Sequence, residues 1–206
     1  MTSTPDLSAE RILSQIIDLP QKRKMIAIAG PPGTGKSTVS AALCMKLRDV
    51  GRKTEVLPMD GFHLDNRLLD QRNLRHRKGA PETFDADGFC SLIERAATGS
   101  AVVFPVFDRN QDIAISGAGY VGPDTEFVVV EGNYLLFDHP AWATLTEYWS
   151  FSVWVGTPKD ELVERLVERW LTEGLTKAQA LEKVQNNDLA NADTIQSNRM
   201  PANLKL

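Results

Sequence analysis

The chain has 206 residues, of which 42% are hydrophobic and 24% are charged, as is ordinary for a soluble globular protein. This length fits one domain with a sizeable core. The formal net charge of −4 argues against a general nucleic-acid-binding protein, because such domains are usually basic. The N-terminus lacks a signal-peptide pattern and no apolar run is long enough to span a membrane. We therefore expect a cytoplasmic protein without nucleic-acid or membrane partners.

The start of the chain alternates between helical and strand patterns. Apolar residues recur on one face of residues 7–19, which predicts an amphipathic helix that Pro20 ends. Residues 25–29 form a short apolar strand, and residues 37–48 have the periodicity of a helix. Cys44 and Cys90 lie in apolar helical patterns without metal-ligand spacing, so we expect both to be free thiols.

Between this strand and this helix, the sequence matches the G-x-x-x-x-G-K-[ST] phosphate-loop pattern. The glycines let backbone N–H groups point inward around phosphates, and the helix adds its positive N-terminal end. Lys36 would reach the β- and γ-phosphates, and the Ser37 hydroxyl would hold Mg²⁺. We therefore predict that the chain binds a nucleoside triphosphate through Gly30, Pro31, Pro32, Gly33, Thr34, Gly35, Lys36, Ser37 and Thr38.

Two acidic residues directly follow predicted strands. Asp60 comes after residues 53–59, and Glu131 comes after the apolar run at residues 125–130. Ligands of open α/β sheets bind beyond the carboxyl ends of the strands. Asp60 is thus a candidate catalytic base or magnesium ligand, and Glu131 a candidate for ordering Mg²⁺ or its water. Aspartate before glycine is also common in turns that bind nothing, so the sequence alone does not decide the role of Asp60. His63 nearby fits either a local hydrogen-bonding group or a catalyst, and its role is likewise undecided.

Strand and helix patterns continue to alternate through the rest of the chain. Helices are predicted at residues 87–97, 159–171 and 176–184, strands at 101–107 and 151–155, and a hairpin or loop at 116–123. Pro105 interrupts the strand at 101–107 and places its second half at an edge or in a loop. The alternation predicts an α/β fold with a doubly wound, mostly parallel sheet and helices on both faces.

Arginines gather in two places. Residues 67–78 are rich in arginine, which by itself predicts a solvated face. Arg165 and Arg169 lie four residues apart and share one face of a predicted helix. They would either close over bound phosphates or pair with Glu161 and Glu168, and the sequence alone favours the ion pairs.

Five blocks in this order resemble the phosphoribulokinase, uridine kinase and bacterial pantothenate kinase family, and look most like its fructose transport system kinases. The blocks are the phosphate loop and residues 59–63, 77–85, 105–109 and 131–136. The resemblance implies a P-loop NTPase fold of three α/β/α layers, with a mostly parallel central sheet and a helical lid. It further implies one kinase domain over residues 1–206, with an N-terminal helix (1–20), acceptor-binding segments (about 61–85 and 104–124) and a lid (about 159–185).

The same resemblance implies roles for individual residues. Asp60 matches the catalytic base, assisted by Lys36 and by the lid arginines Arg165 and Arg169, which reverses the preference for ion pairs. Ser37, Asp60 and Glu131 match the residues that handle magnesium, and Asn187 falls in a segment near the nucleotide base. The residues that fall in acceptor-binding segments are Phe62, His63, Arg77, Phe107, Asp108 and Arg109.

The implied function is transfer of the γ-phosphoryl group of ATP, with Mg²⁺, to a hydroxyl of a sugar, nucleoside or pantothenate-like alcohol. Phe107 stands where pantothenate and uridine kinases tend to have tyrosine, so their acceptor specificities are not transferred. The alternative is a nucleotide-dependent switch or ATPase module without a small-molecule acceptor. Guanine specificity is not expected, because the sequence has no N-K-x-D motif. The sequence does not determine the oligomeric state. The resemblance implies a homodimer as one alternative, because many members of the family are dimers.

Overall fold

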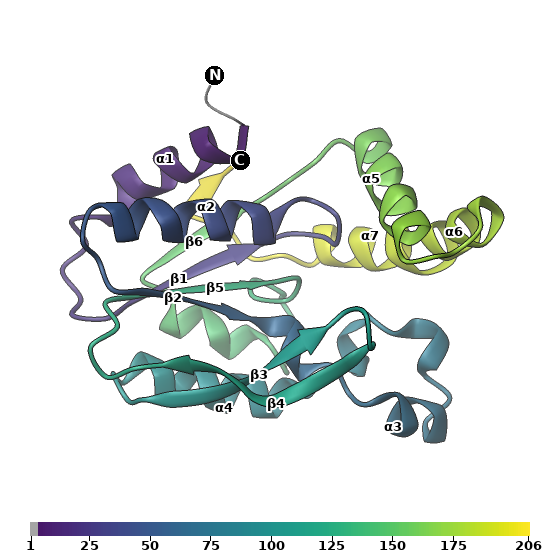
Figure 1. Cartoon of the computed structure of the whole chain (residues 1–206), viewed down its shortest axis with the longest axis horizontal. Helices are drawn as coiled ribbons and strands as arrows, with labels where there is room; N and C mark the ends of the chain where they lie inside the picture. Colours follow the sequence, from purple (N-terminus) through teal and green to yellow (C-terminus); the bar gives the residue numbers. More distant parts are fainter. Residues whose placement is uncertain (1–3) are drawn as a thin grey trace.

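A five-stranded parallel sheet forms the centre of the molecule (Figure 1). The computed structural model describes residues 4–206. From edge to edge the strands are β2 (Thr54–Pro58), β5 (Phe127–Gly132), β1 (Lys24–Ala29), β6 (Phe151–Trp154) and β7 (Leu204–Lys205). All neighbouring pairs are parallel, and in the middle Ile26 pairs with Val129 and Phe151. The predicted α/β fold with a mostly parallel sheet is confirmed.

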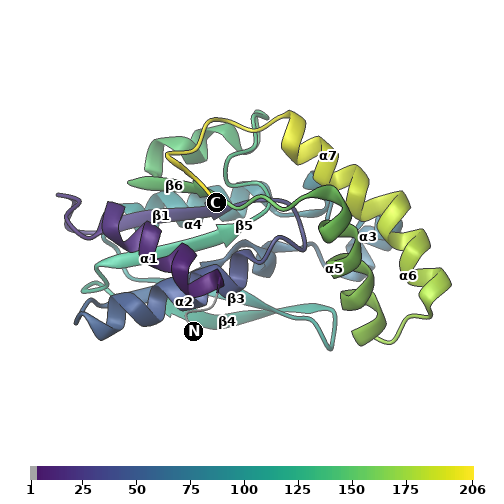
Figure 2. The same cartoon turned by 90° about the horizontal axis from the view of Figure 1, so that it is seen from above.

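Helices cover both faces of this sheet and make three layers (Figures 1 and 2). Helices α1 (Thr4–Ile16) and α2 (Lys36–Asp49) lie on one face, and α4 (Ala86–Ala97) lies on the other. Successive strand residues point to opposite faces, so Ile26 packs with α1 and α2 while Met25 packs on the side of α4. This two-sided burial explains why the central strands are continuously apolar.

Outside the central sheet, β3 (Val102–Asp108) and β4 (Ile113–Val121) form an antiparallel hairpin. The pairing register shifts between Phe104 and Val106, at the proline that was expected to interrupt this strand. The sequence predicts a hairpin or loop over residues 116–123, but most of this stretch is strand β4, and the turn lies earlier, at residues 109–112. Most of β4 is exposed, so its residues do not alternate between apolar and polar types as those of a half-buried strand do. The strand therefore could not be recognised from the sequence.

A helical lid projects from one end of the molecule, where α3 (Asn66–Gln71) also lies (Figure 1). It consists of α5 (Lys159–Thr172), α6 (Lys177–Lys183), a π-helical turn (Val184–Asp188) and α7 (Leu189–Ser197). Its buried cluster, separate from those of the sheet, is Leu162, Leu166, Val184 and Ala192. Short 3₁₀ helices complete the described chain at Met59–Phe62, Arg75–Arg77, Pro81–Thr83 and Ala143–Tyr148.

The first helix and the two cysteines were also predicted from the sequence. The first helix ends at Ile16, so it stops before Pro20 instead of running up to it. Cys44 is buried and Cys90 half-buried, and both are free thiols, as expected. Among residues 4–206, no helix is both long and apolar enough to cross a membrane.

Candidate active site

The phosphate loop lies between the end of β1 and the start of α2. Lys36 is only 8% exposed, and its Nζ donates to the Pro31 carbonyl oxygen at 2.8 Å. The Ser37 hydroxyl donates to Oε1 of Glu131 at 3.0 Å. This contact joins the loop to the end of β5, so the two predicted magnesium-handling groups are adjacent.

The lid packs directly on this loop. Gly33 has φ +80°, a left-handed conformation that glycine adopts without strain. A Cβ at Gly33 would lie 3.0 Å from the side chain of Leu166 and 3.1 Å from that of Leu162, both in α5. A side chain at this position would therefore strain the backbone and crowd Leu162 and Leu166.

The charges around the loop perturb one another. Burial lowers the pKa of the Lys36 ammonium to about 8, although Glu131 and Asp60 act to raise it. Burial raises the pKa of the Glu131 carboxyl, and the negative charge of Asp60 raises it further. A triphosphate would supply the anionic surroundings that favour protonated Lys36.

Asp60 lies in the 3₁₀ helix that follows β2, beside the turn of the β3–β4 hairpin. Its Oδ2 accepts a hydrogen bond from Nη2 of Arg109 at 2.6 Å. The two segments approach closely at Gly61, where a Cβ would lie 2.0 Å from the Pro105 carbonyl oxygen. Glycine at this position therefore allows the hairpin to bring Arg109 to Asp60.

The Asp60 carboxyl is held in its ionised form. Burial acts to raise its pKa, but the positive charges of His63 when protonated, Arg109 and Lys36 outweigh burial and hold the pKa below its usual range. At neutral pH this group is therefore a carboxylate that can accept a proton.

His63 packs against the backbone of Asp60. Its Nδ1 lies 2.7 Å from the Asp60 carbonyl oxygen, and its ring lies 4.0 Å from that of Phe84 and 4.8 Å from that of Phe107, centroid to centroid. Because a carbonyl oxygen only accepts, Nδ1 carries a proton and Nε2 of the neutral ring is an acceptor. Burial lowers the pKa of His63, although Asp60 acts to raise it.

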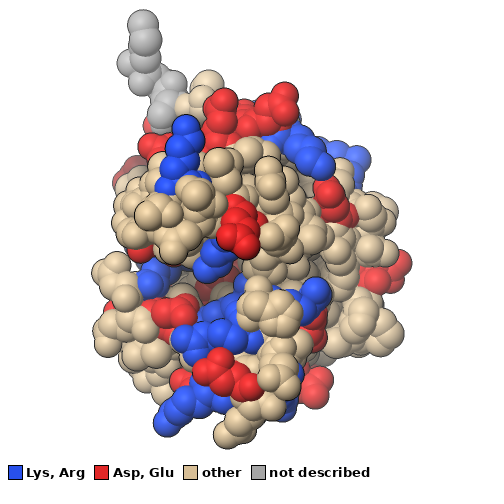
Figure 3. All heavy atoms as spheres, turned by 90° about the vertical axis from the view of Figure 1, so that its right-hand side faces the viewer, with Lys and Arg blue, Asp and Glu red and all other residues tan. Residues whose placement is uncertain are grey.

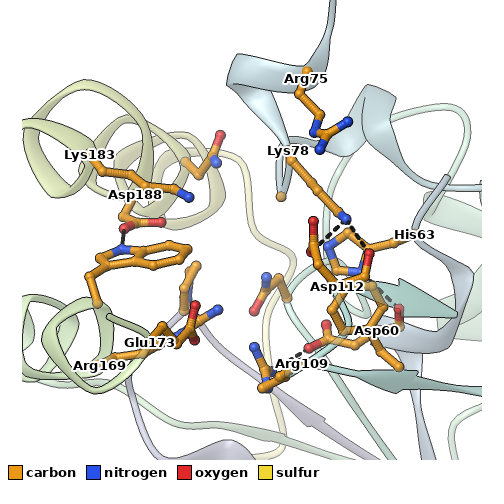
Figure 4. Close-up of a pocket in the computed structure, with 16 residues that line it drawn as sticks. Asp60, His63, Arg75, Lys78, Arg109, Asp112, Arg169, Glu173, Lys183 and Asp188 are labelled. Carbon is orange, nitrogen blue, oxygen red and sulfur yellow. Dashed lines mark hydrogen bonds and ion pairs between the residues drawn. The ribbon is translucent and has the colours of Figure 1, made fainter. Parts of the chain in front are cut away.

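Two adjoining cavities open on these residues. The first, called here the P-loop cavity, is lined by the phosphate loop, Asp60 and Glu131. The second, called here the lid cavity, has a volume of about 280 Å³ and lies between the hairpin turn, the segment with Arg75 and Lys78, and the lid (Figure 4). The residues that line both cavities are Pro32, Asp60, Arg109, Asn133, Arg169 and Glu173.

A third cavity of about 270 Å³ lies beside Pro31 of the loop, between the end of β6 and helices α5 and α7. Its walls include the apolar side chains of Trp154, Leu162 and Leu189, and Gln196 is a polar group at the same site. The loop therefore has a mostly apolar hollow close to its first turn.

Many predicted site residues meet at the first two cavities. Beyond the loop residues Pro32, Gly33, Gly35 and Thr38, these are Lys36, Ser37, Asp60, His63, Phe107, Arg109, Glu131 and Arg169. The two lid arginines differ, because Arg169 lines both cavities whereas Arg165 lines neither. Arg165 forms the predicted ion pair with Glu161. Arg169 pairs at 2.9 Å with Glu173, four residues away on the same helix face, a partner that the alternative with Glu161 and Glu168 did not include.

The predicted loop residues Gly30, Pro31 and Thr34 line neither of these two cavities, and neither do four further predicted residues outside the loop. Phe62 is buried against the ring of Phe89, with centroids 5.1 Å apart. Arg77 pairs with Glu82. The remaining two make backbone contacts: Asp108 accepts from the N–H groups of its own turn, and buried Asn187 donates to the Lys78 carbonyl oxygen at 3.0 Å.

The sequence analysis missed much of the lid cavity. Lys78 donates to Asn66 and Asp112, and this network ties α3 to the hairpin turn. On the lid side, the indole N–H of Trp170 donates to Asp188 at 2.6 Å. Residues that line the cavity without having been singled out as site residues include Arg75, Lys78, Asp112, Trp170, Glu173, Lys183 and Asp188. The arginine-rich run by itself indicated a solvated face, and the family resemblance placed it within the acceptor-binding segment 61–85 without singling out Arg75 or Lys78.

Comparison with known proteins places this site in a family. The chain is 46% identical to a crystal structure described as a "putative fructose transport system kinase" from Silicibacter sp. TM1040, with a TM-score of 0.91 and 99% of each chain covered. It is also 30% identical to the "Putative uridine kinase" of Schizosaccharomyces pombe, over 98% of this chain and 92% of that protein. The chain belongs to the uridine kinase and pantothenate kinase family of P-loop kinases. The family resemblance stated above is thus confirmed.

Other matches extend this comparison. The chain is 35% identical to "Uncharacterized protein YggC" of Escherichia coli (strain K12), over 90% of this chain and 78% of that protein. The family model of the methylmalonyl Co-A mutase-associated GTPase MeaB matches residues 2–63. That match contains the phosphate loop and Asp60 but ends before the hairpin and the lid.

Proposed function

We propose that this protein is an ATP-dependent kinase that transfers the γ-phosphoryl group to a hydroxyl of a small-molecule alcohol. The observation that carries the proposal is the position of Asp60, which lines both the P-loop cavity and the lid cavity. A base that deprotonates an acceptor must reach the acceptor and lie close to the donor phosphate. A carboxylate at the boundary of two cavities meets both requirements.

The P-loop cavity would hold the triphosphate. Backbone N–H groups of the loop and Lys36 would bind its phosphates. The apolar cavity beside Pro31 would hold the adenine ring of the nucleotide. The adjacent oxygens of Ser37 and Glu131 suit Mg²⁺, which in such sites is bound through one or two protein groups plus phosphates. Bound Mg²⁺ would neutralise charge on the phosphates.

The lid cavity would hold the acceptor. Asp60 would accept the proton of the attacking hydroxyl, and its low pKa keeps it ready to do so at neutral pH. Arg109 and Arg169 line both cavities, so they would stabilise charge on the phosphoryl group as it passes between them. Neutral His63 offers an acceptor nitrogen for a further hydroxyl of the substrate.

A second candidate function is a nucleotide-dependent switch or NTPase, and the match of the GTPase model to residues 2–63 favours it. That match is confined to the nucleotide-binding end of the chain. The lid cavity, formed largely by residues beyond 63, has no function in this alternative.

An ADP-release assay tests the proposal. Mg²⁺-ATP and Mg²⁺-GTP would each be mixed with sugars, nucleosides, pantothenate and sugar phosphates. We expect one class of acceptor to raise ADP release from ATP, and Asp60→Asn to abolish the rise. Hydrolysis that is faster with GTP and independent of every acceptor would support the switch instead.

A further inference from the structure

We propose that the acceptor carries an anionic group, a carboxylate or a phosphate ester, which binds between Arg75 and Lys183 at the far end of the lid cavity. This inference rests on the proposed kinase function and names the substrate class for it. Four observations lead to it: how the cations divide between the cavities, which of them are already paired, where the unpaired ones lie, and how much room they leave.

The cations divide into two groups. Arg109 and Arg169 line both cavities and therefore serve the transferring phosphoryl group. Arg75, Lys78 and Lys183 line the lid cavity alone. Side chains of this second group are placed to meet the part of the acceptor that lies away from the reacting hydroxyl.

Lys78 is fully engaged by protein groups. Its Nζ donates to Oδ1 of Asn66 at 2.8 Å, and to Oδ1 and the carbonyl oxygen of Asp112 at 2.7 and 3.1 Å. An ammonium group has three donors, so none remains for a ligand. Asn66 also donates to Oδ2 of Asp112 at 2.7 Å. Asp112 is thereby neutralised and satisfied, and it forms part of the wall.

Arg75 keeps donors for a ligand. It makes one ion pair, with Asp70 at 2.9 Å, and this carboxylate does not line the cavity. The side chains of Arg75 and Asp70 are 49% and 58% exposed, so the pair is well solvated and weak. The remaining guanidinium donors form a planar fork that suits a carboxylate or a phosphate.

Lys183 makes no ion pair within residues 4–206. Its Nζ lies 3.6 Å from the ring centroid of Trp170, a cation–π contact that leaves its N–H groups available. Of the cavity acids whose charges act on Lys183, Asp188 accepts the indole N–H of Trp170, Glu173 pairs with Arg169 and Asp112 pairs with Lys78.

Arg75 and Lys183 stand on opposite walls of the cavity, one beside α3 and one at the end of α6 (Figure 4). Lys and Arg side chains gather around a hollow on this side of the molecule (Figure 3). Arg75 has only the solvated Asp70 as a carboxylate partner and Lys183 has none within residues 4–206, so an anionic ligand can gain charge-assisted contacts from both. A volume of about 280 Å³ limits that ligand to roughly the size of a sugar derivative.

The test compares neutral acceptors with related compounds that carry a carboxylate or a phosphate ester. ADP release would be measured with glycerol against glycerate, glucose against gluconate, ribose against ribose 5-phosphate and fructose against fructose 6-phosphate. We expect an anionic member to be phosphorylated with a KM about 10²-fold below that of its neutral partner, since two charge-assisted contacts are gained. The carboxylate and phosphate arms identify which anion is bound.

Variants locate the anion site. Arg75→Gln and Lys183→Gln should each raise the KM for the anionic acceptor about tenfold and leave kcat and the KM for ATP nearly unchanged. Arg72→Gln, on the same exposed segment, and Lys177→Gln, at the start of α6, are matched controls that should change neither. Both control residues lie outside the lid cavity.

Each contrary outcome has a separate meaning. Equal or faster phosphorylation of a neutral partner would overturn the anionic acceptor and leave the kinase standing. An anionic acceptor whose KM is insensitive to both Arg75→Gln and Lys183→Gln would overturn the assigned position. No acceptor-dependent ADP release in either arm would contradict the proposed kinase function, and this inference would fall with it.

Discussion

The sheet and the lid are stabilised in different ways. The sheet buries continuous apolar strands on both faces, with residues such as Leu43 and Phe127 fully enclosed. The lid encloses a small apolar cluster and depends more on polar contacts, among them the bond from Asn187 to the Lys78 carbonyl. Because the free energy of local opening falls as less apolar surface is buried, we expect the lid to open more readily than the sheet.

Buried polar groups follow the same division. In the sheet region, the Arg23 guanidinium donates to the carbonyl oxygens of Thr125, Ala96, Ser100 and Gly122 and so joins several loops. Around the lid, polar groups bond to one another along the wall of a cavity: Lys78 donates to Asn66 and Asp112, and Trp170 donates to Asp188. The polar groups of the sheet region thus join loops, whereas those at the lid end line a cavity.

The largest expected effect comes from Asp60, at the point where the two regions meet. Asp60→Asn should lower kcat by about 10²- to 10⁴-fold, because the acceptor hydroxyl loses its base. The affinity for ATP should stay close to that of the wild type, as measured by calorimetry. Asp138→Asn, at an exposed position, is the matched control. Unchanged turnover in Asp60→Asn would remove this residue from the mechanism.

Replacing one buried leucine in each region by alanine compares how the sheet and the lid are packed. Leu43 and Leu166 are both fully buried, one under the sheet and one in the lid. Leu43→Ala should lower the global free energy of unfolding by about 2–5 kcal/mol in urea titrations. Leu166→Ala should mainly speed hydrogen exchange in α5–α7 and shift the global midpoint much less. Equal shifts of the midpoint would mean that lid and sheet unfold as one unit.

The two lid arginines sharpen the comparison within one helix. Arg169→Gln should reduce kcat by about 10²-fold, the scale for losing one charge-stabilising donor. Arg165→Gln should have little effect, because Arg165 lines neither the P-loop cavity nor the lid cavity and makes an exposed pair. Steady-state kinetics of both variants would decide this, and an equal loss in the two would assign both arginines to the closed site.

The smallest expected effect concerns pH. In the free protein the Lys36 ammonium, with its pKa lowered to about 8 by burial, loses its proton as the pH rises through that value. Bound phosphates favour the protonated form, so binding above pH 8 must take up a proton. The Kd for Mg²⁺-ATP should therefore rise about tenfold between pH 7 and pH 9. Calorimetry in buffers of different ionisation enthalpy would detect the proton, and a flat Kd would show that Lys36 stays charged.

The sequence predicted the sheet region well because local patterns specify it. The apolar runs, the glycine-rich loop and the acidic residues after β2 and β5 are each visible in a short window. The lid cavity depends on contacts between segments far apart in the chain, such as Lys78 with Asp112 and Asn187 with Lys78. No periodicity encodes such contacts.

Individual residues show the same limit. The arginine-rich run gave no sign that Arg75 faces the cavity while Arg77 pairs with Glu82. Their directions are set by a 3₁₀ turn of three residues, which has no sequence period to recognise. The helical pattern likewise placed Arg165 and Arg169 on one face, but only the packing of α5 on the phosphate loop separates them.

The most direct test follows the γ-phosphoryl group itself. ATP labelled in the γ-phosphate would be incubated with the protein, Mg²⁺ and the acceptors described above, and the labelled products would be separated. The proposed function predicts that the label appears on an alcohol oxygen of an acceptor, with little release as inorganic phosphate in its absence. Label found in inorganic phosphate alone, at a rate that no acceptor changes, would contradict it.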